Sequence, residues 1–138
     1  MSSKQLDSFA RDWILLRSLT LAKSINMTTM MALKQELALG FEAGESIQQL
    51  TQRIGRYFAE KAKYRAEMIS RTETAAASNE GILHRYELEG VDKSEFYPSP
   101  GACEECLSLA GEYPTKEIHG IIPVHPNCQC RWFAVVEL

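Results

Sequence analysis

The sequence predicts an α+β fold, with a helical N-terminal part followed by a small α+β module that contains short strands. Apolar residues recur every three or four positions as far as about residue 82, the spacing that places them on one face of a helix. Later apolar runs are short and rich in residues that favour strands, as in 131–136. The chain's only four cysteines lie between residues 103 and 130. This clustering suggests that the C-terminal end is not stabilised by apolar burial alone.

Length and composition are those of an ordinary globular domain. The 138 residues are 45% hydrophobic and 24% charged, which fits one domain or one domain with a small appendage. We place a helical region at 1–82 and a C-terminal module at 83–138, packed as one compact unit from about residue 30. No stretch approaches the ~18 to 20 apolar residues of a membrane span, and the N-terminus lacks the apolar core of a secretory signal.

Charge is divided unevenly along the chain. Residues 1–86 carry 12 Lys and Arg against 9 Asp and Glu, a net charge of +3. Residues 87–138 carry 3 against 9, a net charge of −6. Modules that grip nucleic acid neutralise its phosphates with Lys and Arg, so this acidic charge argues against such a role for the C-terminal module.

Amphipathic helices are expected in the N-terminal part. A first apolar stripe, a break at 24–29 and a second stripe ending toward Gly40 precede a third stripe, which begins after Ser46. Ser46 can cap this helix, with Gln49 reaching back to complete a capping box. The third stripe extends toward Gly81 and fits either one long helix or two helices joined near Lys61. The stripes are Leu6, Phe9, Trp13, Leu16; Met30, Leu33, Leu37; and Ile47, Leu50, Ile54, Phe58, Ala62, Ala66, Ile69.

The pattern changes after Leu83. Residues 84–88 alternate weakly between polar and apolar, as a strand does, and 96–101 is a loop rich in turn-forming residues. The apolar runs 121–124 and 131–136 have strand preferences. We therefore expect short strands at 84–88, 121–124 and 131–136.

The cysteines form a spaced constellation with one histidine: Cys103-x-x-Cys106, then His125-Pro126-Asn127-Cys128-Gln129-Cys130. Two close cysteine pairs separated by a loop of about twenty residues have the spacing of a structural Zn²⁺ site. In a reducing cytosol, which we expect here, clustered cysteines bind metal more often than they form disulfides. The sequence thus predicts a zinc-stapled module, with disulfide pairing as the alternative.

Five candidate ligands compete for the four positions of a tetrahedral ion. Cys103 and Cys106 fall on one tight turn. Residues two apart point to opposite faces of a regular strand, so His125 and Cys128 should converge more easily than Cys128 and Cys130. His119 is a weaker candidate, because it lies in a loop that the sequence predicts to be exposed.

Catalytic uses of such a cluster lack their partners in the sequence. Zinc deaminases need a His-x-Glu before a Pro-Cys-x-x-Cys, and the chain has no His-x-Glu, while Ala102 precedes Cys103. No His-Glu-x-x-His motif is present. Thioredoxin-like redox chemistry places one Cys-x-x-Cys within a βαβ unit, whereas helices precede this one. We expect a closed structural site and no enzymatic activity.

The order of these motifs resembles a known family. Arg71-Thr72-Glu73, Asn79, Gly90, Cys103-x-x-Cys106 with Gly111, Pro123 and His125-Pro126-Asn127-Cys128-Gln129-Cys130-Arg131 follow one another. This pattern is similar to the Mu F-like minor head proteins of tailed bacteriophages, also called the phage head morphogenesis family. The resemblance covers roughly residues 30–138, and its specificity comes from the combination of motifs.

The resemblance implies a minor structural protein of the phage head that associates with portal or capsid proteins. Such proteins act in head assembly and in DNA packaging or delivery, so the expected locations are the virion and the bacterial cytoplasm during assembly. No catalytic residues carry over from the family. Gln129 stands where the family usually has arginine, and the chain is shorter than most members, which suggests a short prophage form or a truncated version.

Two further sets of polar residues are candidates for contacts. Arg71 and Glu73 could be a solvated helix surface, or they could hold the C-terminal module against the helices through charged hydrogen bonds. A basic cluster interleaved with glutamates could contact packaged DNA weakly, although a solvated face is the simpler interpretation. Its members are Arg53, Arg56, Lys61, Lys63 and Arg65.

An enzyme or toxin, such as a nuclease or a protein-modifying effector, is the alternative function, because related domains occur fused to such proteins. The sequence offers few acid or base groups for this role: His84, His119 and His125 are its only histidines. The partner protein, its copy number and the choice among the five ligands are left open by the sequence.

Overall fold

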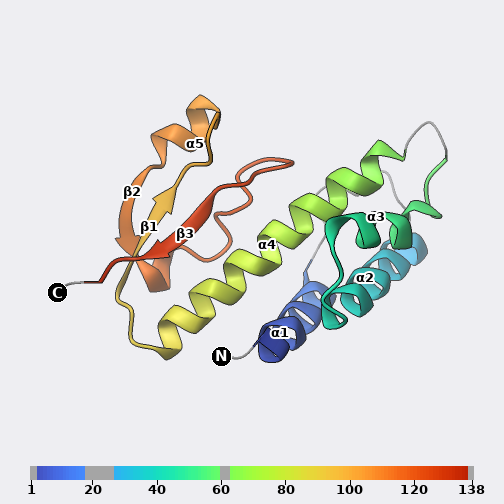
Figure 1. The fold of residues 1–138 in the computed structure, drawn as a ribbon, viewed down its shortest axis with the longest axis horizontal. Coiled ribbons are helices and arrows are strands. Elements are labelled where there is room, and N and C mark those ends of the chain that lie inside the picture. Colours follow the sequence, from blue (N-terminus) through green and yellow to red (C-terminus); the bar gives the residue numbers. More distant parts are fainter. Residues whose placement is uncertain (1–2, 18–26, 60–62, 137–138) are drawn as a thin grey trace.

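The computed structural model describes residues 3–17, 27–59 and 63–136, and it has the predicted α+β fold. Helices dominate the first two thirds of the chain, and a small antiparallel sheet forms in the last third (Figure 1). The elements are α1 Ser3–Leu16, α2 Met27–Glu42, α3 Ile47–Gly55, α4 Tyr64–Leu88, β1 Lys93–Tyr97, α5 Glu104–Ser108, β2 Gly111–Pro114, the 3₁₀ helix η2 Thr115–Glu117 and β3 Arg131–Ala134. Among the described residues, no helix is both long enough and apolar enough to cross a membrane.

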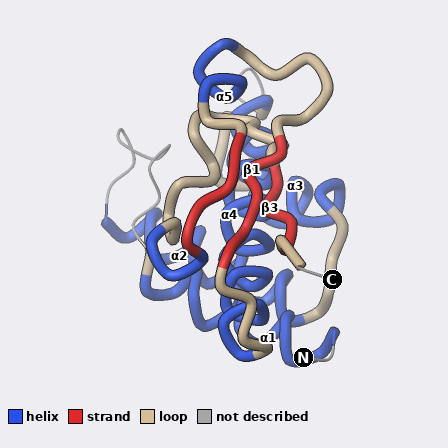
Figure 2. The backbone as a smooth tube through the Cα atoms, turned by 90° about the vertical axis from the view of Figure 1, so that its left-hand side faces the viewer, coloured by secondary structure: helices blue, strands red, loops and turns tan. Residues whose placement is uncertain are grey.

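The long helix α4 separates two apolar cores. Figure 1 shows it running between the α1–α3 group and the sheet, and Figure 2 shows the strands overlying it. Its residues Ala66, Ile69 and Ala77 belong to the core of the helical part. Leu83 belongs to a second core under the sheet, with Phe96 and Trp132. One helix is therefore buried from two sides.

The predicted helix signals of the N-terminal part are largely confirmed. Leu33 and Leu37 are fully buried in α2. Ser46 caps α3, and its reciprocal hydrogen bonds with Gln49 form the predicted capping box. The third stripe is divided between α3 and α4, which is the two-helix alternative.

The buried face of α1 differs in part from the predicted apolar stripe. Leu16 is 89% exposed, whereas Ile14 is fully buried and Trp13 packs against the core. The buried face of α1 therefore turns through Ala10, Trp13 and Ile14, which are three and four residues apart as helix geometry requires. The side chain of Leu6 and residues 24–26 of the predicted break lie outside the described residues, while residues 27–29 already belong to α2, so the break is not observed there.

Glycine at position 40 lets α2 and α3 approach closely. A Cβ atom built on Gly40 would lie 2.3 Å from Cδ2 of Leu50, which is itself fully buried. No side chain fits there unless Leu50 moves, and a fully buried side chain has little room to do so. Gly40 therefore continues the helix to Glu42 while the neighbouring helix packs against its backbone.

The strand predictions are partly wrong. Residues 84–88 are the end of α4, where the ring of His84 stacks on that of Phe9 with centroids 4.9 Å apart. Weak alternation over five residues is compatible with either structure, and packing on both sides of the helix decides it here. The segment 121–124 is irregular and contains the cis Ile122–Pro123 bond. Within 131–136, Arg131–Ala134 forms the predicted strand.

The sheet has the order β2-β1-β3, and both pairs are antiparallel. Phe96 of β1 and Trp132 of β3 face the core, where their rings meet edge to face at 5.3 Å. Tyr97 and Phe133 point to the exposed face. Strand β1, which lies at the centre of the sheet, has its last two residues in the segment predicted to be a loop.

Candidate metal centre

The short helix α5 and the irregular segment 121–130 bring the cysteines together beside the sheet. Cys103 is the N-cap residue of α5, and Cys106 lies one turn later in that helix. His125 and Cys128 lie on a loop in which Asn127 has a positive φ of 61°, a conformation that Asn tolerates well. This reversal allows the Cys128 N–H to donate to the His125 carbonyl at 3.2 Å.

The candidate ligands form two overlapping triads. The ligand atoms of Cys103, Cys106 and His125 all lie within 4.8 Å of one another. Those of Cys106, Cys128 and Cys130 satisfy the same limit, so Cys106 belongs to both groups. Donors of a tetrahedral Zn²⁺ site are separated by roughly 3.5 to 3.8 Å. The structure therefore brings all five sequence-predicted ligands to one place, and this cluster could hold a metal ion.

The expected separation of Cys128 and Cys130 is wrong. Their side chains meet Cys106 in one triad, because residues 128–130 are irregular and β3 begins only at Arg131. Opposite orientation of residues two apart applies within a regular strand. Cys130 is therefore no less well placed than Cys128.

Burial divides the cluster into an interior and an exposed side. Cys106, Cys128 and Cys130 are buried, whereas Cys103 is exposed, and all four cysteines are free. Burial, together with the neighbouring thiols, raises the pKa of Cys106 well above its usual range. The pKa of Cys103 is lowered, chiefly because the backbone N–H of Cys106 donates to its sulfur.

The ring orientation of His125 is fixed by a hydrogen bond. Its Nδ1 lies 2.8 Å from the carbonyl oxygen of Pro126, to which it donates, and this bond is the main reason that the pKa of His125 is raised. The other nitrogen, Nε2, lies 3.2 Å from the sulfur of Cys106. Metal-binding histidines commonly use one nitrogen for the ion and the other for such a backbone bond, so Nε2 is the candidate donor.

The donor set suits a soft or borderline divalent ion. Thiolates and an imidazole nitrogen are the usual ligands of structural zinc, and they do not suit Mg²⁺ or Ca²⁺, which prefer oxygen. A cluster of three buried thiols also has an electrostatic reason to bind a cation, since a cation stabilises the thiolate forms that burial otherwise disfavours. No known protein family, curated protein or solved structure matches the chain.

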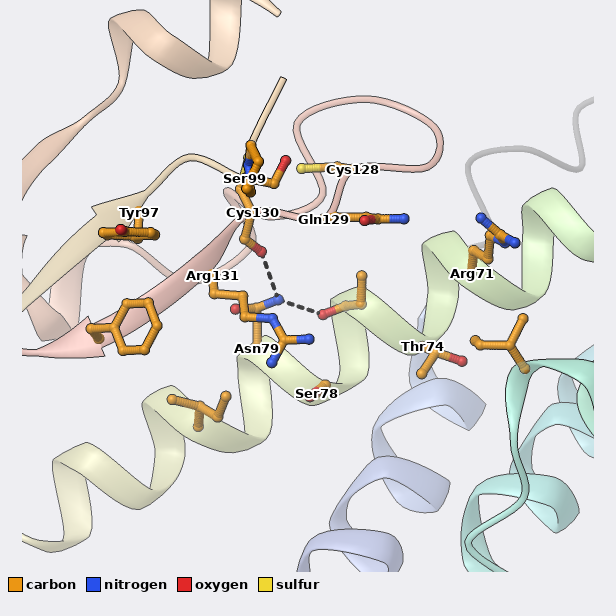
Figure 3. Close-up of a pocket in the computed structure, with 15 residues that line it drawn as sticks. Arg71, Thr74, Ser78, Asn79, Tyr97, Ser99, Cys128, Gln129, Cys130 and Arg131 are labelled. Atoms are coloured by element: carbon orange, nitrogen blue, oxygen red, sulfur yellow. Dashed lines mark hydrogen bonds between the residues drawn. The ribbon is translucent and has the colours of Figure 1, made fainter. Parts of the chain in front are cut away.

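A buried amide, that of Asn79, connects the metal loop to α4; the sequence indicated this residue only as part of the family pattern and predicted no role for it. The Nδ2 of Asn79 donates to the carbonyl of Ala75 at 2.8 Å and to that of Cys130 at 3.4 Å (Figure 3). Its Oδ1 accepts from the backbone N–H of Trp132 at 3.3 Å. One side chain thus satisfies backbone groups on both sides of Arg131.

Two more polar residues on this face of α4 bind the module. Thr72 accepts a hydrogen bond from the backbone N–H of Asn127, at 2.9 Å, and so holds the turn between His125 and Cys128. Glu80 accepts from the Gly120 N–H at 2.6 Å. Thr72 and Asn79 are seven residues apart, or two helical turns, and buried polar residues at this spacing are the signal that could have identified them.

Of the two alternatives for Arg71 and Glu73, contact with the C-terminal module is not observed for either side chain, and a solvated surface describes Arg71 but not Glu73. Glu73 is fully buried but faces the helical part, where Arg17 Nε lies 3.0 Å from its Oε2. Burial raises the pKa of Glu73, although the charges of Arg17 and Lys34 oppose this rise. Arg71 pairs with Glu67 at 2.7 Å on the same helix. The face that binds the module is one residue away, at Thr72.

His119 lies outside the metal cluster and instead contacts two glutamates of α4. Its Nδ1 lies 2.8 Å from Glu80 Oε2, and its Nε2 contacts Glu87 Oε1. Partial burial opposes protonation of His119, but the hydrogen bonds and charges of the two glutamates outweigh it, and the pKa of His119 is raised. The loop after η2 is thereby clamped to α4.

Part of the basic cluster is neutralised by ion pairs. Arg53 pairs with Glu45 at 2.6 Å and with Glu36 at 3.3 Å, and Arg56 pairs with Glu36 at 2.5 Å. Lys61 lies outside the described residues. Arg53 and Arg56 therefore form ion pairs that connect the end of α3 to α2 and to the turn between these helices.

We expect replacement of Asn79 to loosen the module. Asn79→Ala leaves the Trp132 N–H and the Cys130 carbonyl without this partner, at a cost of about 1 to 3 kcal/mol in the free energy of unfolding. Denaturation of the metal-loaded protein measures it. Ser78→Ala, at an exposed neighbouring position, is the matched control and should change stability by about 0.5 kcal/mol or less. Equal effects of the two substitutions would contradict the assigned role.

We expect the His119 clamp to make stability depend on pH. Because the pKa of His119 is raised above the ordinary 6.5, its contribution is fully present below that value and is lost as pH rises through the folded-state pKa. The free-energy difference between wild type and His119→Gln should thus be larger at acidic than at alkaline pH. Denaturation of both proteins across this range tests the effect, and a difference independent of pH would refute it.

Proposed function

We propose that this protein is a minor structural component of the head of a tailed phage or prophage, of the Mu F-like kind. It would associate with portal or capsid proteins and act in head morphogenesis and in DNA packaging or delivery. On this proposal it is found in virions, and in the bacterial cytoplasm while heads assemble. A weak contact with packaged DNA is compatible with this role.

One observation carries the proposal. Several of the residues on which the resemblance rests are distant in the sequence, yet they meet at one site. Asn79 of α4 bonds to the backbone at Cys130 and Trp132, and Cys130 meets Cys106 and Cys128. Motif residues that converge in this way support a shared structural plan more strongly than their order alone. A structural protein of this kind requires no catalytic group, because its role is to form stable contacts with its partner proteins.

The proposal includes Zn²⁺ as the resident ion. Cys106, Cys128 and Cys130 would supply three buried thiolates, and Cys103 and His125 would compete for the fourth position. The ion would supply the cross-links that a small core lacks, since structural zinc contributes directly to folding. This role suits a module whose buried apolar cluster includes three of the four cysteines themselves.

We expect the ligands to differ in importance. Cys106→Ser removes the donor shared by both triads and should abolish stoichiometric zinc. Cys103→Ser and His125→Ala should each retain zinc with weaker affinity, and the double variant should lose it. Native mass spectrometry, with elemental analysis and competition by a chelator, measures these outcomes. Stoichiometric, chelator-resistant zinc in Cys106→Ser would refute the ligand assignment.

We expect the protein to be part of phage particles. After induction of a host that carries the gene, gradient-purified procapsids and virions should contain the chain in low copy number, and it should co-purify with the portal protein. Immunoblotting and immunogold electron microscopy detect it. Absence from both kinds of particle, or turnover of RNA, DNA or a nucleotide cofactor by the zinc-loaded protein, would contradict the structural role and favour an enzyme or toxin.

A further inference from the structure

A groove of about 590 Å³ lies where α4 faces the segment 128–131 and Phe133 of β3 (Figure 3). Ser78 and Ile82 line it from α4, and Phe133 lines it from β3. Two arginines also line it, Arg71 from α4 and Arg131 from β3, and no Asp or Glu is among the described lining residues. This composition contrasts with residues 87–138, whose net charge is −6.

The arginines leave positive charge in the groove. Figure 3 shows the side chain of Arg131 extending toward α4 near Ser78 and Asn79. Within the described residues Arg131 has no ion-pair partner, and Arg71 has only Glu67, whose side chain is 52% exposed. An exposed pair of this kind contributes little energy, so Arg71 remains able to bind an incoming carboxylate. The groove is therefore electrostatically suited to an acidic ligand.

The backbone at the edge of β3 is only partly satisfied. Val135 donates to the Lys93 carbonyl in β1, and N–H groups alternate in direction along a strand. Phe133 therefore also faces β1, while Trp132 and Ala134 face outward. The first two outward-facing backbone groups, the Cys130 carbonyl and the Trp132 N–H, are hydrogen-bonded to the side-chain amide of Asn79. The next pair, the Trp132 carbonyl and the Ala134 N–H, has no hydrogen-bond partner in the described part of the chain. These two groups flank Phe133, the residue of β3 at which the groove ends, and are not themselves part of its lining.

We propose that this groove binds an extended acidic segment of a partner protein, which adds to the sheet beside β3. A peptide in this position would continue the bonding pattern that the Asn79 amide begins, with a backbone unit on the Trp132 carbonyl and the Ala134 N–H. Addition of a strand to a free edge gives affinity through the backbone and specificity through side-chain pockets. Carboxylates of the segment would pair with Arg71 and Arg131, and apolar side chains would contact Ile82 and Phe133.

Charge distinguishes this occupant from the alternatives. A second copy pairing through its own β3 edge would present the same groove, whose described lining has two arginines and no Asp or Glu, and surfaces of like charge oppose association. The other edge of the sheet, along β2, is a poorer site, because Glu112 is exposed on it and Pro114 lacks an N–H. The inference rests on the groove and holds whether or not the protein belongs to a phage head.

A peptide selection tests the proposal directly. A displayed library of random ten-residue peptides is panned on the immobilised, metal-loaded full chain at low ionic strength. We expect enrichment of acidic sequences with alternating apolar residues. A labelled selected peptide should then bind wild type, and Arg131→Glu should weaken it at least about tenfold, equivalent to about 1.4 kcal/mol. Arg85→Glu is the matched control, because Arg85 is an exposed arginine of α4 outside the groove, and it should bind as wild type does.

Hydrogen exchange locates the peptide on the backbone without any substitution. Bound peptide should slow exchange of the Ala134 amide, while the Val135 amide, which already donates to Lys93, serves as the internal reference. Ala134→Pro removes the outward N–H and should weaken binding in the same assay. The proposal is overturned if no acidic peptide is enriched, if Arg131→Glu and Arg85→Glu act alike, or if exchange at Ala134 is unchanged by bound peptide.

Discussion

The structure depends on the burial of one helix from two sides. On one side, α4 packs against α1 and α3, and its small and aliphatic residues such as Ala66, Ile69 and Ala77 join the core that α2 also lines. On the other side, Leu83 enters the core beneath the sheet. Each face has its own polar contacts: Glu73 meets Arg17 within the helical part, whereas Thr72, Asn79 and Glu80 meet backbone groups of the module. A helix with two partners has two buried faces, and the residues between Ala66 and Leu83 that lie on them must each fit one partner or the other.

The contacts between α4 and the module also explain how irregular chain is kept in place. Residues 121–130 have no ladder of backbone hydrogen bonds, and such a segment needs other partners for its polar groups. Thr72 supplies one to Asn127, and Asn79 supplies one to Cys130. The loop that carries His125, Cys128 and Cys130 is thus positioned by a regular helix. A metal site benefits from this arrangement, because ligands held before the ion arrives lose less conformational entropy when they bind it.

The sequence predicted the fold class and the residues of the cluster because both follow from local patterns. Helical periodicity and the capping box at Ser46 depend on residues within a few turns of one another. The spacing of the cysteines reflects how a short turn directs two thiols to one point. The strand predictions at 84–88 and 121–124 failed because tertiary packing decided them: α4 continues while both its faces find partners. The alternative in which Arg71 and Glu73 contact the module missed the contacting residue, Thr72, by one position, about 100° around the helix, which local pattern could not exclude.

The two-sided burial of α4 has a consequence for the boundaries of the protein. A cut within α4 would leave each fragment with an apolar surface that its missing half normally covers. A fragment that kept the whole helix but lost the sheet would expose the face around Leu83, and would leave the amide of Asn79 without the Cys130 carbonyl and the Trp132 N–H. Exposed surface of this kind promotes aggregation. The chain from α1 to β3 is therefore one indivisible unit for truncation, fusion or recombination, in which insertions are tolerated best at surface loops between the elements.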